Sequence, residues 1–321
     1  MSCFHPLYVR YYDGEFARFG GKLTSTILNN PEPGEEIVPV PCGKCEGCRL
    51  DRSRRWADRM LLEFERPAGD LPPRTALFMT LTYADDHLPL VTTTDHQRRG
   101  NLCLKDVQDY IKRLRKWVFP RKLRYFLAGE YGDRTFRPHY HAIVFGLSLT
   151  DFGDSVPWSS GEQDGSINYV SPTLQRLWQH GNVMVSEANY KTFCYVARYV
   201  LKKQFGADAS SVYRGRKPPF VVMSRRPGLG MTYFEAEKEY NAASIFDGTD
   251  VRLVQRPRVA FDKLKDSDPY LYEILAADRR ELARKRQELV LKRVDYDYLT
   301  KCKIDEQFFV DKMRSLHKRD F

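Results

Sequence analysis

The fold of this chain is most restricted by two apolar segments that follow each other almost without interruption. Residues 122–132 (KLRYFLAGEYG) and 138–146 (PHYHAIVFG) have the β-branched and aromatic content of strands. The link between them starts with Gly132, Asp133 and Arg134 and is too short for the crossover that parallel strands need. We therefore expect an antiparallel hairpin, in which the end of the first strand lies beside the start of the second.

The remaining elements follow in an order that does not strictly alternate strands with helices. Further strands are expected at 75–83, 182–188 and 219–230, and helices at 104–118, 171–181 and 189–206, the last with Asn189 as N-cap and Gly206 as stop. This order favours an α+β fold with a central five-stranded antiparallel sheet and flanking helices.

The two ends of the chain differ from this centre. Residues 4–20 resemble a hairpin with a turn at Asp13 and Gly14, residues 28–40 form a proline-rich connector, and the chain is mostly helical and charged from about Asp268. We expect three domains: 1–70 with a hairpin, a cysteine cluster and a basic helix, 71–235 with the sheet, and a charged helical region at 236–321.

Two histidines stand at the start of the second strand of the hairpin. Because side chains alternate along a strand, His139 and His141 point to one face and Tyr140 to the other. Glu130 ends the preceding strand, so the hairpin brings its carboxylate next to both imidazoles. Two histidines and one carboxylate leave coordination positions open, as a catalytic metal site requires. The alternative is two ordinary histidines at a strand end.

Two tyrosines stand four residues apart in the segment CYVARYVLKK. On a helix this spacing places Tyr195 and Tyr199 on one face, with Lys202 and Lys203 close by. A metal and ammonium groups favour the phenolate, which is the nucleophilic form. The alternative is an aromatic stripe that packs in the core.

A third cluster consists of cysteines with regular spacing. Cys42, Cys45 and Cys48 form a C-x-x-C-x-x-C pattern. Three thiolates require a fourth ligand, for which Cys3 is the first choice and His5 the second. A structural Zn²⁺ is the leading interpretation; an iron–sulfur cluster and unliganded thiols are the alternatives.

Taken together, the segments FMTLTY, RPHYHAIVFG and YVARYVLKK resemble, in order, the three motifs of the HUH endonucleases that initiate rolling-circle replication. The paired tyrosines, PCGKCEGCR and SRRPGLG are similar to the initiators of microviruses of the gokushovirus branch. Tyr140 departs from the pattern, because the residue between the histidines is usually aliphatic. The resemblance implies a five-stranded antiparallel sheet, with Mg²⁺ or Mn²⁺ held by His139, His141 and an acidic residue, for which we expect Glu130.

The resemblance also implies the chemistry. Tyr195 and Tyr199 are the expected nucleophiles: one attacks a DNA phosphodiester and stays joined to the 5′ phosphate, and the freed 3′-OH primes synthesis. The second acts in the later cleavage and joining that circularise the genome. Lys203 is the expected helper and Lys202 its alternative, and their nearness favours Tyr199 as the first nucleophile.

The same resemblance implies single-stranded origin DNA, a host helicase and a host polymerase as partners, in the cytoplasm of a bacterial host cell. A plasmid relaxase and an HUH transposase share this chemistry. A non-catalytic protein of the same fold that binds an origin or RNA, and a zinc hydrolase with two histidines and one glutamate, are alternatives of other classes.

The charge of the chain agrees with a polyanionic partner. Lys and Arg number 52 against 42 Asp and Glu, which gives a net charge of +10. We expect DNA contacts from Arg52, Arg55 and Arg59, with Trp56 available to stack on a base. Arg225 and Arg226 lie on an expected turn and are further candidates. A solvated helix face is the alternative for the first three.

Composition excludes two other classes. No stretch approaches the ~18 consecutive apolar residues of a membrane span, and the start of the chain lacks the apolar core of a secretory signal. The seven cysteines are an odd number and three of them are clustered, which argues against a disulfide framework and for reduced thiols.

Overall fold

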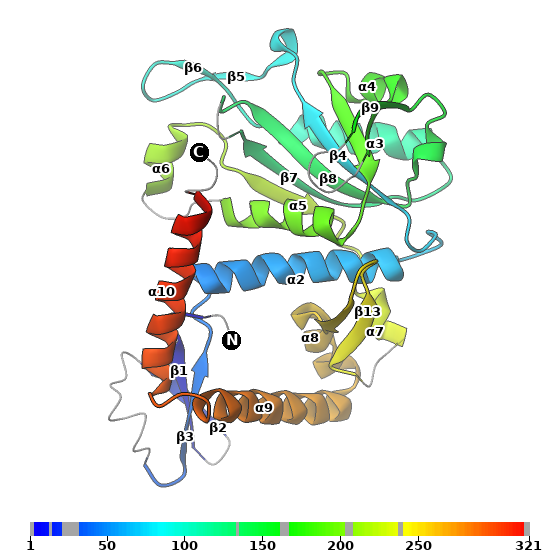
Figure 1. The fold of residues 1–321 in the computed structure, drawn as a ribbon. Coiled ribbons are helices and arrows are strands. Elements are labelled where there is room, and N and C mark those ends of the chain that lie inside the picture. Colours follow the sequence, from blue (N-terminus) through cyan, green and yellow to red (C-terminus); the bar gives the residue numbers. More distant parts are fainter. Residues whose placement is uncertain are drawn as a thin grey trace. The chain divides into compact units, whose positions relative to one another are not determined.

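The computed structural model describes residues 3–12, 15–20, 32–132, 135–160, 167–202, 208–236 and 240–317. The chain forms two compact units (Figure 1). The larger comprises residues 53–272, and the smaller joins both ends of the chain, residues 1–52 and 273–321. The division into three consecutive domains at residues 70 and 235 stays a prediction.

The larger unit is built on one antiparallel sheet. Its strand order is β12-β7-β8-β4-β11-β10-β9. The strands are β4 (Ala76–Thr82), β7 (Arg124–Tyr131), β8 (Pro138–Phe145), β9 (Val156–Ser160), β10 (Ile167–Val170), β11 (Val183–Glu187) and β12 (Phe220–Met223).

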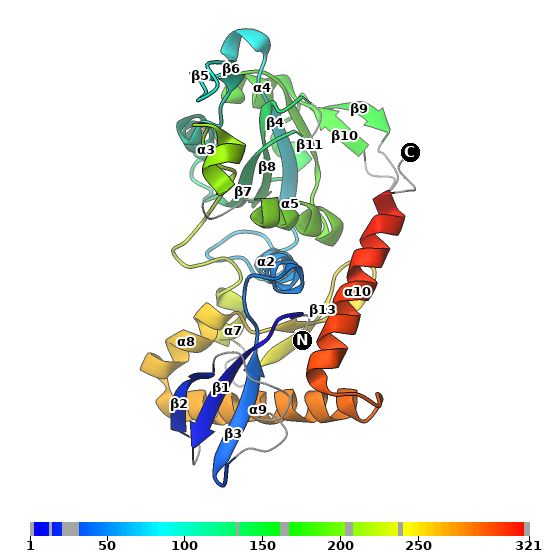
Figure 2. The same cartoon turned by 90° about the vertical axis from the view of Figure 1, so that its left-hand side faces the viewer.

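The α+β class is confirmed, but the expected strand count of five is wrong. The five expected strands are all present, and β9 and β10 extend the sheet beyond β11 (Figure 2). These two strands are short, and the segment around them, VPWSSGEQDGSINYV, is polar and glycine-containing. It therefore carries a weak strand pattern, and pairing with β11 supplies what local preference does not.

Helices cover both faces of this sheet. On one face, α3 (Leu104–Trp117) and α4 (Pro172–Trp178) pack on side chains from β4, β8 and β11. On the other, α2 (Glu46–Glu65) and α5 (Tyr190–Lys202) pack on β7 and β8. The N-cap prediction at Asn189 is confirmed, because its Oδ1 accepts a hydrogen bond from Thr192 N at 3.0 Å. The expected stop at Gly206 lies outside the described residues.

Shorter elements complete the larger unit. They are the 3₁₀ turns η1 (Asp85–His87) and η2 (Leu149–Asp151), the hairpin β5 (Leu90–Thr92) and β6 (Arg98–Gly100), α6 (Asp208–Tyr213), α7 (Thr232–Ala236), the hairpin β13 (Ala242–Phe246) and β14 (Val251–Gln255), and α8 (Arg258–Ser267). Ile245 and Val254 of the last hairpin belong to the core under α2 and α5. This hairpin lies in a region that we expected to be helical.

A buried ion pair fastens α2 to the sheet. Glu63, on α2, is completely buried and pairs with Arg124 at the start of β7. The carboxylate also accepts hydrogen bonds from Gly230 N at 2.7 Å and Ala68 N at 3.2 Å. Partners from separate segments thus satisfy one buried charge, which makes it costly to remove any of them.

The smaller unit contains a three-stranded sheet of order β2-β1-β3 together with two long helices. Its elements are β1 (Leu7–Tyr12), β2 (Glu15–Gly20), β3 (Glu35–Val40), α9 (Pro269–Leu291) and α10 (Tyr298–His317). The expected strands of the first hairpin are present, and its turn at 13–14 lies outside the described residues. The expected connector ends instead as β3.

Long-range contacts hold the two ends of the chain together in this unit. The rings of Phe4 and Phe309 lie 5.7 Å apart, and His5 Nε2 lies 2.9 Å from Glu306 Oε1. Among the described residues, no helix is long and apolar enough to cross a membrane.

Candidate active site

The register of the β7–β8 hairpin assembles the predicted metal ligands. Glu130 lies directly opposite His139, and Ala128 lies opposite His141. Glu130 Oε1 is 2.9 Å from His139 Nε2 and 3.7 Å from His141 Nε2. One potential ligand atom from each residue lies within 4.8 Å of the other two. This group could therefore hold a metal ion through two imidazoles and a carboxylate.

The other nitrogen of each imidazole also has a partner. His139 Nδ1 lies 3.2 Å from the carbonyl oxygen of Arg137, and His141 Nδ1 lies 3.1 Å from Thr80 Oγ1. A proton on Nδ1 directs the Nε2 lone pair of each ring towards Glu130, which is the arrangement that metal-binding histidines use. Sequence reasoning missed Thr80, although its position on β4 opposite His141 follows from the alternation of FMTLTY.

Helix α5 places both predicted nucleophiles against this group. The Tyr199 ring is nearly parallel to the His141 ring, at 4.7 Å and 4°, and the Tyr195 ring meets it edge-on at 5.2 Å. The two tyrosine rings are 5.3 Å apart and perpendicular. Phe78, from β4, stacks on His141 at 5.9 Å and contacts Tyr195 at 5.8 Å. The four-residue spacing therefore brings both phenols to the predicted metal site.

The two tyrosines differ in their exposure to solvent. Tyr195 is 39% exposed, whereas Tyr199 is only 7% exposed. Burial raises the pKa of the Tyr199 phenol, and hydrogen bonding to Tyr195 and the negative charge of Glu130 raise it further. Tyr199 is consequently a neutral, enclosed phenol, while Tyr195 faces the solvent from which DNA arrives.

Cationic groups near the tyrosines include one that the sequence did not single out. Lys202 is the last residue of α5, and Lys203 lies outside the described residues. Arg198 is exposed on α5, with its guanidinium carbon 5.9 Å from the centre of the Tyr195 ring. Its place between the tyrosines, on an otherwise apolar helix face, is the signal that could have identified it.

Tyr140 has a separate role on the opposite face of β8. It is fully buried, and its hydroxyl accepts a hydrogen bond from Cys103 N at 2.8 Å and lies 2.9 Å from the hydroxyl of Tyr83. Tyr83 in turn donates to Asp106 at 2.7 Å. The aromatic residue between the histidines thus ties their strand to the first turn of α3.

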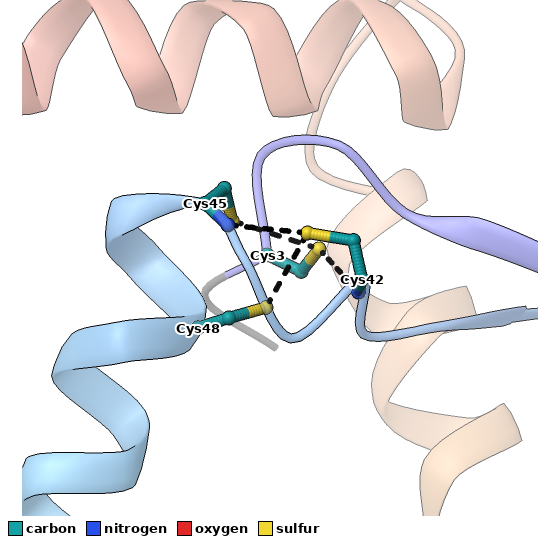
Figure 3. A group of neighbouring side chains, drawn as sticks. All are labelled: Cys3, Cys42, Cys45 and Cys48. Carbon is teal, nitrogen blue, oxygen red and sulfur yellow. Dashed lines mark hydrogen bonds between the residues drawn. The ribbon is translucent and has the colours of Figure 1, made fainter. Parts of the chain in front are cut away.

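The four predicted cysteine ligands meet in the smaller unit (Figure 3). Their sulfur atoms all lie within 4.8 Å of one another, and Cys3–Cys45 and Cys42–Cys48 are both 3.9 Å apart. His5, the second choice for the fourth ligand, instead pairs with Glu306. Cys3, Cys42, Cys45 and Cys48 form a group that could bind zinc.

Backbone N–H groups point at these sulfur atoms. Phe4 N donates to Cys45 Sγ at 3.4 Å, and Cys42 N donates to Cys3 Sγ at 3.3 Å. Although burial by itself raises the pKa of the Cys45 thiol, backbone hydrogen bonds from Cys48 and Phe4 outweigh it and lower that pKa to about 6. Burial raises the pKa of Cys3. A cation would therefore find one thiolate already formed and release protons from others.

The predicted DNA-binding arginines fall into two groups. Arg225 and Arg226 are exposed on the turn after β12, and Arg52 and Arg55 are exposed on α2, Arg52 also donating to Gly43 O at 3.1 Å.

Arg59 differs from this prediction, and so does Trp56. Arg59 Nε donates to Leu229 O at 3.0 Å, and its guanidinium lies 4.3 Å above the Trp56 ring, which packs on Phe126. We therefore assign both residues to the packing of α2.

Comparison with known proteins agrees with this site. Residues 76–204, which contain every residue of the metal group and both tyrosines, match the replication-associated protein ORF2 family. The chain is 30% identical over 316 residues to "Replication-associated protein ORF2" of Spiroplasma virus 4, an alignment that covers 93% of each protein.

Two further relatives are similar over shorter lengths. "Replication-associated protein ORF4" of Chlamydia phage 1 is 33% identical over 201 residues, which cover 61% of this chain and 46% of that protein. "Replication-associated protein VP4" of Bdellovibrio phage phiMH2K is 31% identical over 248 residues, which cover 74% and 69%. No solved structure matches the chain.

Proposed function

Since this chain belongs to the replication-associated protein ORF2 family, we propose that it is a replication initiator of a microvirus-like phage and nicks single-stranded origin DNA through a phosphotyrosine. One observation carries the chemical part of the proposal. Glu130, His139 and His141 converge within 4.8 Å, and two tyrosine rings lie against His141. A core stripe of tyrosines would not require a charged, partly buried group of this kind beneath it.

The residues present suit Mg²⁺ or Mn²⁺. Glu130 supplies a hard carboxylate oxygen, and the Nε2 atoms of His139 and His141 supply two nitrogens, with their Nδ1 atoms held from behind. When bound there, such an ion would act as a Lewis acid on the scissile phosphate. Zn²⁺ also suits this donor set, so the choice of ion is left to measurement.

Tyr195 makes the first attack in our proposal, although nearness to the lysines favoured Tyr199. Tyr195 is the exposed phenol, and Tyr199 must leave its stack on His141 before it reaches an incoming phosphate. The Tyr195 oxygen forms a bond to phosphorus, the bond from phosphorus to the 3′ oxygen breaks, and the phenol proton ends on that oxygen. The 5′ phosphate stays on the tyrosine and conserves the bond energy for joining.

Tyr199 acts second. After one round of synthesis, Tyr199 attacks the regenerated site, and the released 3′-OH attacks the phosphotyrosine at Tyr195 to close a circle. Lys202 and Lys203 are proposed to neutralise the phosphate during these steps. Arg198 joins them on the grounds of its position beside Tyr195.

The exposed arginines hold the DNA in this proposal. Arg225 and Arg226 lie on the turn that follows the sheet edge at β12, and Arg52 and Arg55 lie on α2. Contacts of this type bind phosphates without regard to sequence and weaken as salt increases. By resemblance to the family, a host helicase and a host polymerase extend the nicked strand in the bacterial cytoplasm.

The cysteine group is proposed to bind one structural Zn²⁺. Its four sulfur atoms fill a tetrahedral set, and the N–H groups that point at them stabilise negative charge on sulfur. A closed site with four protein ligands leaves no position for a substrate, so its role is to stabilise the smaller unit. An iron–sulfur cluster is the alternative that elemental analysis distinguishes.

A denaturing gel tests the proposed reaction. The protein is mixed with a labelled single strand carrying the phage origin and with Mn²⁺, and a labelled band that migrates with the protein after denaturation is expected. A Tyr195→Phe/Tyr199→Phe double variant should give no such band yet still bind the strand. An adduct on the double variant would place the nucleophile elsewhere, and binding without any adduct would favour a non-catalytic origin-binding protein.

A further inference from the structure

A row of side chains crosses the sheet from the metal group to its far edge. Successive strand pairings place Thr80 opposite His141, Met184 opposite Thr80, Val170 opposite Met184 and Val156 opposite Val170. Directly paired residues of antiparallel strands share a face. The whole row therefore lies on the face that carries the histidines.

The outer part of this row is open to solvent. Helix α5 packs over β7, β8 and β12, at the other side of the sheet. Beyond it, Met184 is 37% exposed and Val156 is 52% exposed. Trp158 follows Val156 by two residues on β9, so alternation places it on the same face, where it is 67% exposed. We call Thr80, Met184, Val170, Val156 and Trp158 the sheet strip.

The chemistry of the sheet strip differs from that of a phosphate-binding surface. None of its five members is charged, and four are apolar or aromatic. Exposed apolar surface that is continuous with a reactive site indicates a binding surface. A large exposed indole offers a planar surface on which a nucleobase of any kind can stack.

We propose that the sheet strip is a stacking platform for the bases of the single strand next to the scissile phosphate, with Trp158 as its outer anchor. This rests on the proposed function, because the strip starts at the metal group: Thr80 Oγ1 is 3.1 Å from His141 Nδ1. The sugar–phosphate backbone of the strand faces solvent and the arginines, while its bases cover the apolar side chains.

The dimensions of the strip suit a single strand better than a protein. From β8 to β9 there are four strand spacings of about 4.8 Å, or about 19 Å in all. This length matches at most about six nucleotides at the roughly 3.4 Å rise of a stacked strand. A stable protein interface involves about 20–30 residues a side, far more than one row supplies.

Binding of a single strand to the Tyr195→Phe/Tyr199→Phe protein, without divalent metal, tests this inference independently of cleavage. The probe is a fluorescein-labelled oligothymidylate of about 20 nucleotides, longer than the site of one such surface. Trp158→Ala in this background should weaken binding about 10-fold, as expected for the loss of one stacked base. Trp158→Phe should restore most of it.

Trp117→Ala provides the matched control. Trp117 is 49% exposed on α3, which packs on the opposite face of the sheet, so its removal should leave binding unchanged. The salt dependence gives a second criterion. Trp158→Ala should lower affinity at every salt concentration without changing the slope, whereas Arg225→Ala should reduce the slope by about one.

An oligonucleotide with abasic sites examines the unmutated side chain. Replacing the bases by abasic sites should weaken binding to the Trp158 protein by about 10-fold more than binding to the Trp158→Ala variant. Equal losses in the two proteins would overturn the inference. So would unchanged affinity of Trp158→Ala combined with a change in oligomeric state, which would identify the strip as a self-association surface. Because adduct formation is measured separately, either failure leaves the nicking proposal standing.

Discussion

Replacing the two tyrosines one at a time distinguishes their roles. Their Cα atoms are separated by four residues, or about 6 Å along the helix axis, and their rings lie 5.3 Å apart. A phosphate aligned with one phenol is therefore several ångströms from the other. Since misplacement by about 1 Å can cost about 10²-fold in rate, Tyr195→Phe should slow the first cleavage at least about 10²-fold, or about 2.7 kcal/mol in activation free energy.

Tyr199→Phe should have the reverse effects. The first cleavage should fall less than about 10-fold, because Tyr199 contributes only its ring contact with His141 to that step. Joining into circles should be lost, since it needs a second nucleophile while Tyr195 is occupied.

Single-turnover formation of the covalent adduct on a labelled origin strand measures the first step, and the yield of circular product measures the second. Tyr270→Phe is the control, because that phenol is exposed on α9 at a distance in sequence from the site. A faster first cleavage by Tyr195→Phe than by Tyr199→Phe would refute the assignment from exposure and restore Tyr199 as the first nucleophile.

Three further predictions concern the metal group, the cysteines and the core. His141→Ala should abolish adduct formation with Mn²⁺ while gel-shift affinity for the strand stays within about threefold, because phosphate contacts dominate binding; near-normal nicking would remove the metal group from the mechanism. The purified protein should contain about one zinc per chain. After zinc removal, Cys45 should be alkylated before Cys3, with its rate rising through about pH 6, because its pKa is lowered to about 6 while that of Cys3 is raised; mass spectrometry that found Cys3 modified first would contradict this. For stability, the depressed Cys45 pKa contributes fully above its unfolded value, and this contribution declines as pH falls from about 9 towards 6. Glu63→Ala should lower the free energy of unfolding by about 3–5 kcal/mol in urea titrations because it leaves Arg124 buried without its partner, whereas Glu65→Ala, which removes a partly exposed pair with Arg74, should cost less than about 1 kcal/mol.

The sequence alone determined the elements whose signals are local. The alternation of PHYHAIVFG and the short link before it predicted the β7–β8 hairpin, and with it the meeting of Glu130, His139 and His141. The spacing of Tyr195 and Tyr199 predicted that they share a helix face. The C-x-x-C-x-x-C pattern predicted three converging sulfur atoms. Each of these depends on periodicity over a few residues, which the backbone geometry fixes without help from distant segments.

Tertiary structure decided what depends on packing between segments far apart in the chain. Burial of Tyr199 against His141 and exposure of Tyr195 arise because α5 crosses β7 and β8 at one depth and angle. Arg59 and Trp56 carry the sequence pattern of a basic helix face, yet the carbonyl of Leu229 and the ring of Phe126 hold them inside. Strands β9 and β10 form because β11 offers an edge to pair with, and Phe4 meets Phe309 from the opposite end of the chain. Such contacts involve partners that no local pattern specifies, because folding selects them by the area they bury together.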